Sequence, residues 1–239
     1  MFRKLAFGAV VALGSVVMAA PDARDDLSAA AKKLSDASNY SWKTTSEGGG
    51  FGGGNQEGKT EKGGPTLITL SFGDNQVQVA TKGQKAAIKT DDGWKTPDEL
   101  GGNDGGQPGP GTFIARMVQQ FKPPGAQAEE YASKIKEVKK EDDAYTTELT
   151  GADAAGLMPR FGRRGGGGGN AQPPQMQNAK LGLKMWVKDG VLTKITTHLT
   201  GTINFNGEDR DIDRTTTVEI SDIGSTKIEL PDEAKKKLE

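Results

Sequence analysis

Residues 180–205, KLGLKMWVKDGVLTKITTHLTGTINF, carry the clearest structural pattern in this chain. In the first part of the segment the odd positions are apolar and the even positions are mostly lysine. From residue 191 onward the odd positions again hold the apolar side chains, while threonines, His198 and Asn204 fill most of the even positions. Alternation with a period of two is typical of a strand with one buried face. The segment therefore predicts two neighbouring antiparallel strands, whose inward residues are Leu181, Leu183, Met185, Val187, Val191, Ile195, Leu199, Ile203 and Phe205.

The loop between these two strands is expected to have an odd length, because both strands point their odd residues inward. Lys188-Asp189-Gly190 supplies a three-residue loop in which Gly190 takes the left-handed conformation, as in a hairpin with a G1 bulge. The predicted pairs are Leu183 with Ile195, Met185 with Thr193 and, on the other face, Lys184 with Lys194 and Trp186 with Leu192.

A second hairpin is predicted at Asn206-Gly207, a dipeptide that favours a two-residue turn and pairs odd positions with even ones. The strand that follows agrees, since its apolar residues Ile212, Val218 and Ile220 are even. Rows of side chains are thus expected across three strands, Leu183–Ile195–Val218 and Met185–Thr193–Ile220. After a turn at 221–225, Ile228 and Leu230 predict a short last strand that ends at Pro231.

Composition limits the classes to which the protein can belong. The chain has 239 residues, a formal net charge of -1 and no cysteine. The charge gives no general attraction to nucleic acid, and the missing thiols exclude disulfides and thiolate zinc sites. The length suits a single domain with a genuine core.

Residues 1–19 are expected to form a secretory signal peptide. Arg3 and Lys4 give it a basic start, 5–17 is an apolar run too short to span a bilayer comfortably, and cleavage is expected after Ala19. The alternative is an uncleaved N-terminal anchor. Either way the sequence predicts an exported protein, periplasmic or extracellular, with one domain over 20–239.

The remaining segments add helices and strands to the predicted sheet. An amphipathic helix is expected from Asp25 to about Ala37, a first strand over 40–46, and further strands over 66–72, 76–81 and 85–90. A second helix over 112–121 is expected to lie across the open side of the sheet, and 126–133 suggests a short third helix. The segment 135–149 is expected to be extended. Glycine-rich flexible insertions are expected near 47–64, 101–111 and 162–178.

This order of parts resembles the LolA/LppX-type lipoprotein-carrier superfamily, through the N-terminal amphipathic helix, Asn39-Tyr40-Ser41-Trp42, the mid-chain helical segment and the closing strands. Residues 184–190 and 213–220 also resemble exported planctomycete proteins of unassigned function. The resemblance implies an α+β fold, in which an antiparallel, unclosed half-barrel sheet has helices packed on its concave face. It also implies a pocket for acyl chains between sheet and helices.

Residues with catalytic chemistry are scarce. His198 is the only histidine and is expected on the polar face of the sheet, where a solvated surface role outweighs catalysis. Asp209, Asp211 and Asp213 alternate as in a calcium loop, yet no turn glycine or spaced glutamate follows, so a solvated strand face is the simpler interpretation. The run 160–169 resembles an RGG element, although a flexible loop fits an exported protein better. We expect no enzyme, no metal, no cofactor and no nucleic-acid partner.

Two kinds of function remain open. The first is a non-enzymatic binding protein that carries or senses a lipid or other hydrophobe in a pocket between sheet and helices. The second is a structural or interaction protein of the cell envelope with a filled core, no ligand and a protein partner. For the first, the residues expected at the ligand are Trp42, Ile68, Leu70, Phe72, Met117, Phe121, Leu183, Met185, Ile195, Val218 and Ile220.

Two arginines complete this predicted site. The register places Arg214 opposite Leu199 and Arg210 opposite Ile203, on the otherwise apolar face. There they are expected to engage an anionic headgroup at the rim of the pocket. The alternative is a hairpin that projects beyond the core, with both arginines solvated and paired with Asp209 or Asp211.

Overall fold

The computed structural model describes residues 22–49, 55–72, 75–101, 103–104, 107–108, 118, 120–157, 176–205 and 208–239. The predicted signal peptide, the Asn206-Gly207 turn and the glycine-rich run from 162 to 175 lie outside these residues. No helix within them combines the length and the apolar character needed to cross a membrane.

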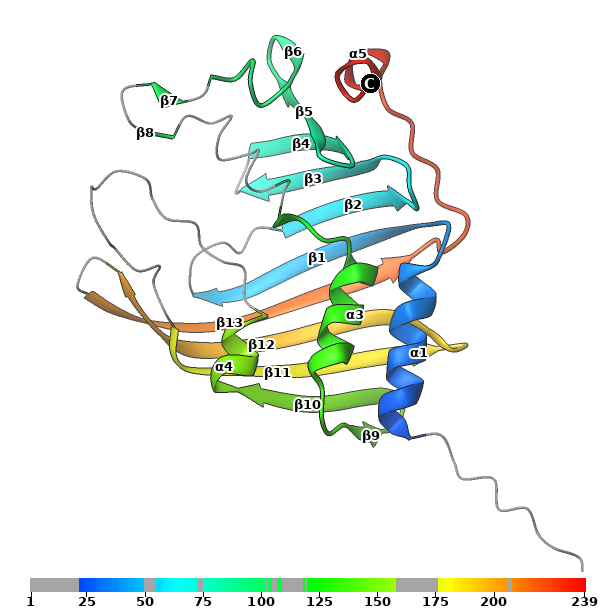
Figure 1. The fold of residues 1–239 in the computed structure, drawn as a ribbon, viewed down its shortest axis with the longest axis vertical. Coiled ribbons are helices and arrows are strands. Elements are labelled where there is room, and N and C mark those ends of the chain that lie inside the picture. The colour runs from blue at the N-terminus through cyan, green and yellow to red at the C-terminus, as the bar shows by residue number, and fades with distance from the viewer. Residues whose placement is uncertain are drawn as a thin grey trace, which may run out of the picture.

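One antiparallel sheet of 11 strands organises the described chain, in the order β6-β5-β4-β3-β2-β1-β13-β12-β11-β10-β9 (Figure 1). The two edges, β6 and β9, do not pair with each other, so the sheet is not closed. A separate two-stranded ladder joins β7 (Asn103–Asp104) to β8 (Gln107–Pro108). The strands of the large sheet are β1 (Asn39–Gly49), β2 (Asn55–Glu61), β3 (Thr66–Phe72), β4 (Asn75–Lys82), β5 (Lys85–Thr90), β6 (Gly93–Lys95), β9 (Lys139–Glu141), β10 (Ala144–Thr150), β11 (Met176–Lys188), β12 (Val191–Phe205) and β13 (Glu208–Ser221).

Two helices, α1 (Ala23–Ser35) and α3 (Pro124–Lys134), lie side by side across one face of the sheet, which we call the concave face (Figure 1). The predicted fold class, an unclosed antiparallel half-barrel with helices on its concave face, is confirmed. Helix α1 begins after Asp22, whose carboxylate accepts a hydrogen bond from Arg24 N–H at 3.2 Å. Its predicted apolar stripe is also confirmed, since Leu27, Ala30, Ala31 and Leu34 are all buried.

Small residues let α3 approach α1 closely. A Cβ on Gly125 would lie 2.8 Å from Ser35 Cα, so the first turn of α3 needs this glycine. Ala128, Tyr131 and Ala132 then bury their side chains in the main core. The third helix predicted from the sequence is therefore confirmed. Of the helix predicted over 112–121, only Val118 and Gln120 are described as helical, and residues 111–117 lie outside the described chain.

The predicted register of the β11–β12 hairpin was wrong by two residues. Met185 pairs with Ile195, Leu183 with Thr197 and Trp186 with Lys194. The turn has two residues rather than three, because Asp189 (φ 54°) and Gly190 (φ 70°) are both left-handed, as a type I′ turn requires. Odd residues still pair with odd residues further along the hairpin, because a bulge adds one residue to β12. The extra residue is Thr193, between the pairs Trp186–Lys194 and Val187–Leu192.

In the next hairpin, odd residues of β12 pair with even residues of β13, as predicted. Ile195 pairs with Val218, Leu199 with Arg214 and Ile203 with Arg210. The side-chain rows actually run Met185–Ile195–Val218–Thr44. Ile220 pairs with Trp42 in the next row.

Strand β2 corrects the expectation of a flexible insertion over 47–64. Residues 55–61 pair with both β1 and β3 although none of them is apolar. The pattern failed because the concave side of β2 is filled by a neighbour: the Trp42 indole lies over Gly58, where a Cβ would come within 2.0 Å of its ring. The insertion expected over 162–178 likewise ends earlier, since β11 begins at Met176.

Two further segments differ from the prediction. The extended segment 135–149 is a hairpin of β9 and β10, and it is followed by the short helix α4 (Gly151–Ala155). Residues 226–231 form no strand in the described sheet. They lead instead to helix α5 (Asp232–Lys237), and Leu230, Ala234 and Leu238 cover Ala80, Ala87 and Trp94 on the convex face of β4–β6.

Candidate functional site

Much of the predicted ligand site lies in the packed core beneath the helices. Leu183, Met185, Ile195, Val218 and Ile220 are all at most 8% exposed and belong to one cluster with α1 and α3. A ligand could reach these side chains only if the helices moved. Their contact with a ligand stays a prediction.

Trp42 and Phe121 lie at the edge of this core. Their rings stack at a centroid distance of 6.1 Å and an interplanar angle of 24°, and the Tyr40 ring lies tilted beside Trp42 at a centroid distance of 6.0 Å. Ile68 is buried in the same cluster, whereas Leu70 and Phe121 are only half-buried against it. The Trp42 Nε1–H is buried without a hydrogen-bond partner in the described structure. Met117 and the side chain of Phe72 lie outside the described chain.

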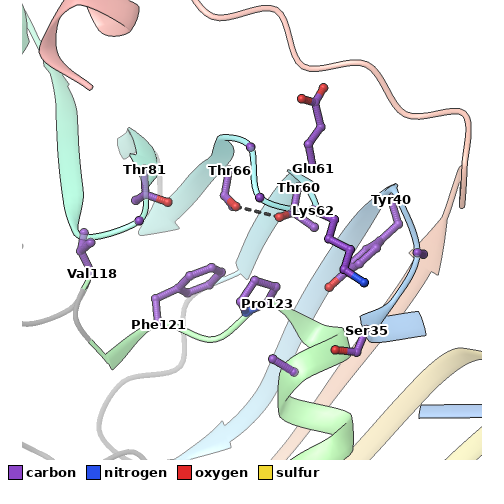
Figure 2. Close-up of a pocket in the computed structure, with 15 residues that line it drawn as sticks. Ser35, Tyr40, Thr60, Glu61, Lys62, Thr66, Thr81, Val118, Phe121 and Pro123 are labelled. Atoms are coloured by element: carbon purple, nitrogen blue, oxygen red, sulfur yellow. Dashed lines mark hydrogen bonds between the residues drawn. The ribbon is translucent and has the colours of Figure 1, made fainter. Parts of the chain in front are cut away.

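A pocket of about 370 Å³ opens beside Phe121, where the ends of α1 and α3 meet the turns of the sheet (Figure 2). Val118, Phe121, Pro123 and Ala126 form one wall, just before and within the start of α3. The end of α1 supplies Ser35 and Ala37. The sheet supplies Tyr40, Thr60, Glu61, Lys62, Gly63, Gly64, Thr66, Thr81 and Gly83.

Hydroxyl groups from four adjacent strands form a continuous row in this pocket. Tyr40 pairs with Thr60, Thr60 with Thr66 and Thr66 with Thr81 in the strand register. All four residues are at most 8% exposed, and all four line the pocket. The Thr60 and Thr66 hydroxyls are hydrogen-bonded to each other at 2.8 Å, as Figure 2 shows.

Tyr40 connects this row to helix α3. Gly125 N–H donates a hydrogen bond to Tyr40 Oη at 2.9 Å. Burial raises the pKa of Tyr40 to about 12, although the bond from Gly125 opposes the rise. The phenol therefore keeps its proton at neutral pH, and its O–H can still donate a hydrogen bond to a partner.

Charged groups gather at the rim of the pocket. Lys62 Nζ lies 2.8 Å from Asp36 Oδ1, and Lys32 Nζ lies 2.7 Å from Asp36 Oδ2. Hydrogen bonds from these two lysines lower the pKa of Asp36 to about 2, so its carboxylate stays ionised. These exposed ion pairs tie the end of α1 to the β2–β3 turn, and they contribute little stability by themselves.

The two predicted arginines differ in their surroundings. Arg210 is exposed and lies 3.4 Å from Glu208, its neighbour two residues away in β13. Arg214 is half-buried on the concave face. Burial lowers the pKa of its guanidinium, and the charge interaction with Tyr131 partly offsets this decrease. Neither arginine lines the pocket of Figure 2. Their role at an anionic headgroup stays a prediction.

His198 lies on the exposed convex face, as predicted. Its Nε2 is 2.9 Å from Asp213 Oδ1, while Asp211 and Asp209 accept hydrogen bonds from Thr202 and Asn204. Each of the three aspartates thus has its own cross-strand partner. Among the described residues no group of three or more acidic, histidine or cysteine side chains could hold a metal ion.

The polar half of the pocket was missed from the sequence. Thr60 and Lys62 lie in the segment taken for a flexible insertion, so their alignment with Thr66 could not be recognised. A strand placed at 55–61 would have aligned Tyr40, Thr60, Thr66 and Thr81 in one row. No local apolar pattern marks that strand, because Gly58, two residues before Thr60 on the same face, is covered by Trp42 from the neighbouring strand.

Comparisons with known proteins concern the fold. No family model matches the chain, and no curated protein matches it. Among solved structures, the chain is similar to LprF from Mycobacterium bovis, with a TM-score of 0.45 and 10% identity over 90% of this chain and 98% of LprF. It is also similar to the lipoprotein LppX from Mycobacterium tuberculosis, with a TM-score of 0.41 and 11% identity over 86% of this chain and 96% of LppX.

A third similar structure is a LolA superfamily protein from Nitrosomonas europaea, with a TM-score of 0.29 and 12% identity over 89% of this chain and 96% of that chain. The resemblance expected from the sequence is thus found among solved structures, as a likeness of fold. Identities of 10% to 12% carry over neither a ligand nor an activity.

Proposed function

We propose that this protein is a non-enzymatic binding protein, which holds a hydrophobic or amphipathic small molecule in the pocket between its sheet and helix α3. The observation that supports this most is the pocket of about 370 Å³ beside the half-buried Phe121. That volume lies within the range of about 300–1,000 Å³ found for ligand sites. Carrying or sensing such a molecule outside the cytoplasm agrees with the signal peptide predicted over 1–19.

The apolar wall of the pocket supplies the driving force for binding. Val118, Phe121 and Pro123 present apolar surface, and Trp42 backs Phe121 from the core. Burial of an alkyl chain against this wall contributes roughly 0.8 kcal/mol per methylene group. A chain too long for the pocket would continue toward Leu70 and Ile68 on the same face.

The packed core favours the alternative function. Met185 and Leu192 are fully buried beneath the helices, so this part of the concave face offers no open channel to a long acyl chain. In a structural or interaction protein of the cell envelope, the helices would remain in place and the pocket would stay empty. The two functions make opposite predictions for ligand binding.

Binding of N-phenyl-1-naphthylamine, together with native mass spectrometry of the purified protein, distinguishes the two functions. We expect the dye to bind one site and to be displaced by a co-purifying hydrophobe of defined mass. Ala126→Trp, which fills the pocket from α3, should lower dye affinity at least tenfold. The control Gln127→Trp changes the neighbouring position, which does not line the pocket. A clean apo mass without dye binding, or equal loss in both variants, would count against the proposal.

A further inference from the structure

The buried part of the pocket is lined by hydroxyl groups rather than by charges. Tyr40, Thr60, Thr66 and Thr81 form the hydroxyl row, and Val118 is the other buried lining residue among those described. No buried side chain in the described lining of the pocket carries a charge. The inner part of this site is therefore polar but uncharged.

The groups of this row can both donate and accept hydrogen bonds. A hydroxyl carries one O–H donor and two acceptor lone pairs. Thr60 and Thr66 use one donor and one lone pair in their mutual hydrogen bond at 2.8 Å, so the pair can still donate one hydrogen bond and accept others. Tyr40 accepts a hydrogen bond from Gly125 N–H and has its own O–H to donate. The row therefore suits an alcohol, which also does both, better than a carboxylate, which only accepts, or an ammonium, which only donates.

The charged residues around the pocket have both signs and lie at its rim. Glu61 and Lys62 line the pocket where β2 turns into β3. The carboxylate of Glu61 is directed away from the hydrogen-bonded threonine pair (Figure 2), and Lys62 pairs with Asp36. Asp36 also pairs with Lys32, whose charge interacts in addition with Glu129. A charged head placed against the hydroxyl row would be buried without an opposite charge beside it, which is costly.

We infer that the ligand is an uncharged amphiphile with a hydroxyl-bearing head, which binds the row at Thr60, Thr66 and Thr81 while its apolar part packs on Phe121 and Val118. This inference rests on the proposed function and specifies its ligand class. An alcohol or polyol head exchanges its hydrogen bonds to water for hydrogen bonds to the row, and no charge is left unpaired. The apolar wall that receives the chain belongs to the same pocket.

Four probes with the same ten-carbon chain length test the head group on the purified protein at neutral pH, by displacement of N-phenyl-1-naphthylamine. Two of them, 1-decanoylglycerol and methyl decanoate, are uncharged esters that differ in the hydroxyls of the head. The other two, decanoate and decyltrimethylammonium, are charged. We expect 1-decanoylglycerol to bind at least tenfold tighter than each of the other three. Apolarity alone would give the opposite order for the two esters, since methyl decanoate is the more apolar.

The outcomes of this comparison separate the inference from the proposed function. If either charged probe, or methyl decanoate, binds as tightly as 1-decanoylglycerol, the inference is overturned and the proposed function stands. If neither the dye nor any probe binds, the proposed function itself fails.

Variants of the hydroxyl row separate recognition from packing. The double variant Thr60→Val/Thr66→Val keeps the shape of both side chains and removes both partners of one hydrogen bond, which costs little stability. Its affinity for 1-decanoylglycerol should fall about fivefold, while its affinity for methyl decanoate stays within twofold. Thr60→Ser/Thr66→Ser keeps both hydroxyls and should retain the preference for 1-decanoylglycerol.

The matched control is Thr196→Val/Thr217→Val, which removes a second cross-strand pair of hydrogen-bonded threonines, at 3.1 Å, from the convex face. It should change the affinity for neither ester. An equal loss for both esters in Thr60→Val/Thr66→Val would show a packing defect and overturn the role assigned to the row.

Discussion

Gly58 shows how one residue can hide a strand from sequence analysis. Strand β2 carries no apolar side chain, yet it pairs along its length with β1 and β3. Its concave side is covered by the Trp42 indole, which crosses from β1 and lies over Gly58. The hydrophobic signal for β2 is therefore displaced onto the neighbouring strand.

Substitution of Gly58 tests this packing. In Gly58→Ala the new Cβ would lie 2.0 Å from Trp42 Cζ2, so the buried indole must move. We expect a loss of roughly 1–3 kcal/mol in the free energy of unfolding, measured by urea denaturation. The matched control is Gly182→Ala in β11, whose Cβ would meet His198 at an ordinary 3.7 Å. It should be neutral or slightly stabilising.

A double-mutant cycle identifies the cause of that loss. If the indole is the obstacle, Gly58→Ala should cost at least about 1 kcal/mol less in a Trp42→Phe background, because the smaller ring leaves room. Additive effects would instead place the strain in the backbone of β2.

At the scale of elements, the closing hairpins show what side-chain parity can and cannot establish. Alternation correctly placed Leu183, Met185, Ile195 and Leu199 on one face of the sheet. It could not distinguish a three-residue loop from a two-residue turn with a bulge at Thr193, because both arrangements pair odd residues of one strand with odd residues of the other. The face was predictable away from the bulge, whereas the pairing partners were not. Leu192, expected on the polar face opposite Trp186, instead pairs with Val187 and is fully buried in the core.

The C-terminal segment shows a different limit of the same reasoning. Ile228 and Leu230 alternate as in a strand, but β1 already occupies the free side of β13. Because β13 has no free side, the segment crosses the convex face instead and packs Leu230 against Trp94 and α5. Local alternation cannot reveal that a sheet edge is already taken.

Removal of this contact should loosen one end of the sheet. Leu230→Ala should lower the free energy of unfolding by about 2 kcal/mol, near the lower limit for buried leucines because this cluster is small. Hydrogen exchange of β5 and β6 should rise more than that of β11 and β12. The control Glu229→Ala changes an exposed neighbour and should leave both unchanged. A uniform rise across all four strands would mean that the segment stabilises the whole fold.

On the scale of the whole molecule, the sheet has two differently covered ends. Helices α1 and α3 lie over the part of the sheet formed by β1, β13, β12, β11 and β10 (Figure 1). The C-terminal segment covers the opposite face of the sheet near β4 to β6. The layout was predictable from the order of helices and strands. The pocket was not, because it combines α1, the approach to α3 and the turns of the strands β1–β5, including β2, which has no apolar pattern.

This uneven coverage predicts uneven dynamics, with the pocket in the less stable part. The main core spans β10–β13, β1 and both large helices, whereas β4 and β5 contribute mostly alanines and small satellite clusters. In the protein without ligand, amides of 75–90 should therefore exchange faster than those of 181–199. N-phenyl-1-naphthylamine at about 100 times its Kd should stabilise openings that destroy the pocket by roughly 2.7 kcal/mol, or about a hundredfold in exchange rate. That protection should concentrate at 60–66 and 79–83, leave β11–β12 unchanged and disappear in Ala126→Trp. Protection centred on β11–β12 would instead place the ligand within the core beneath α1 and α3.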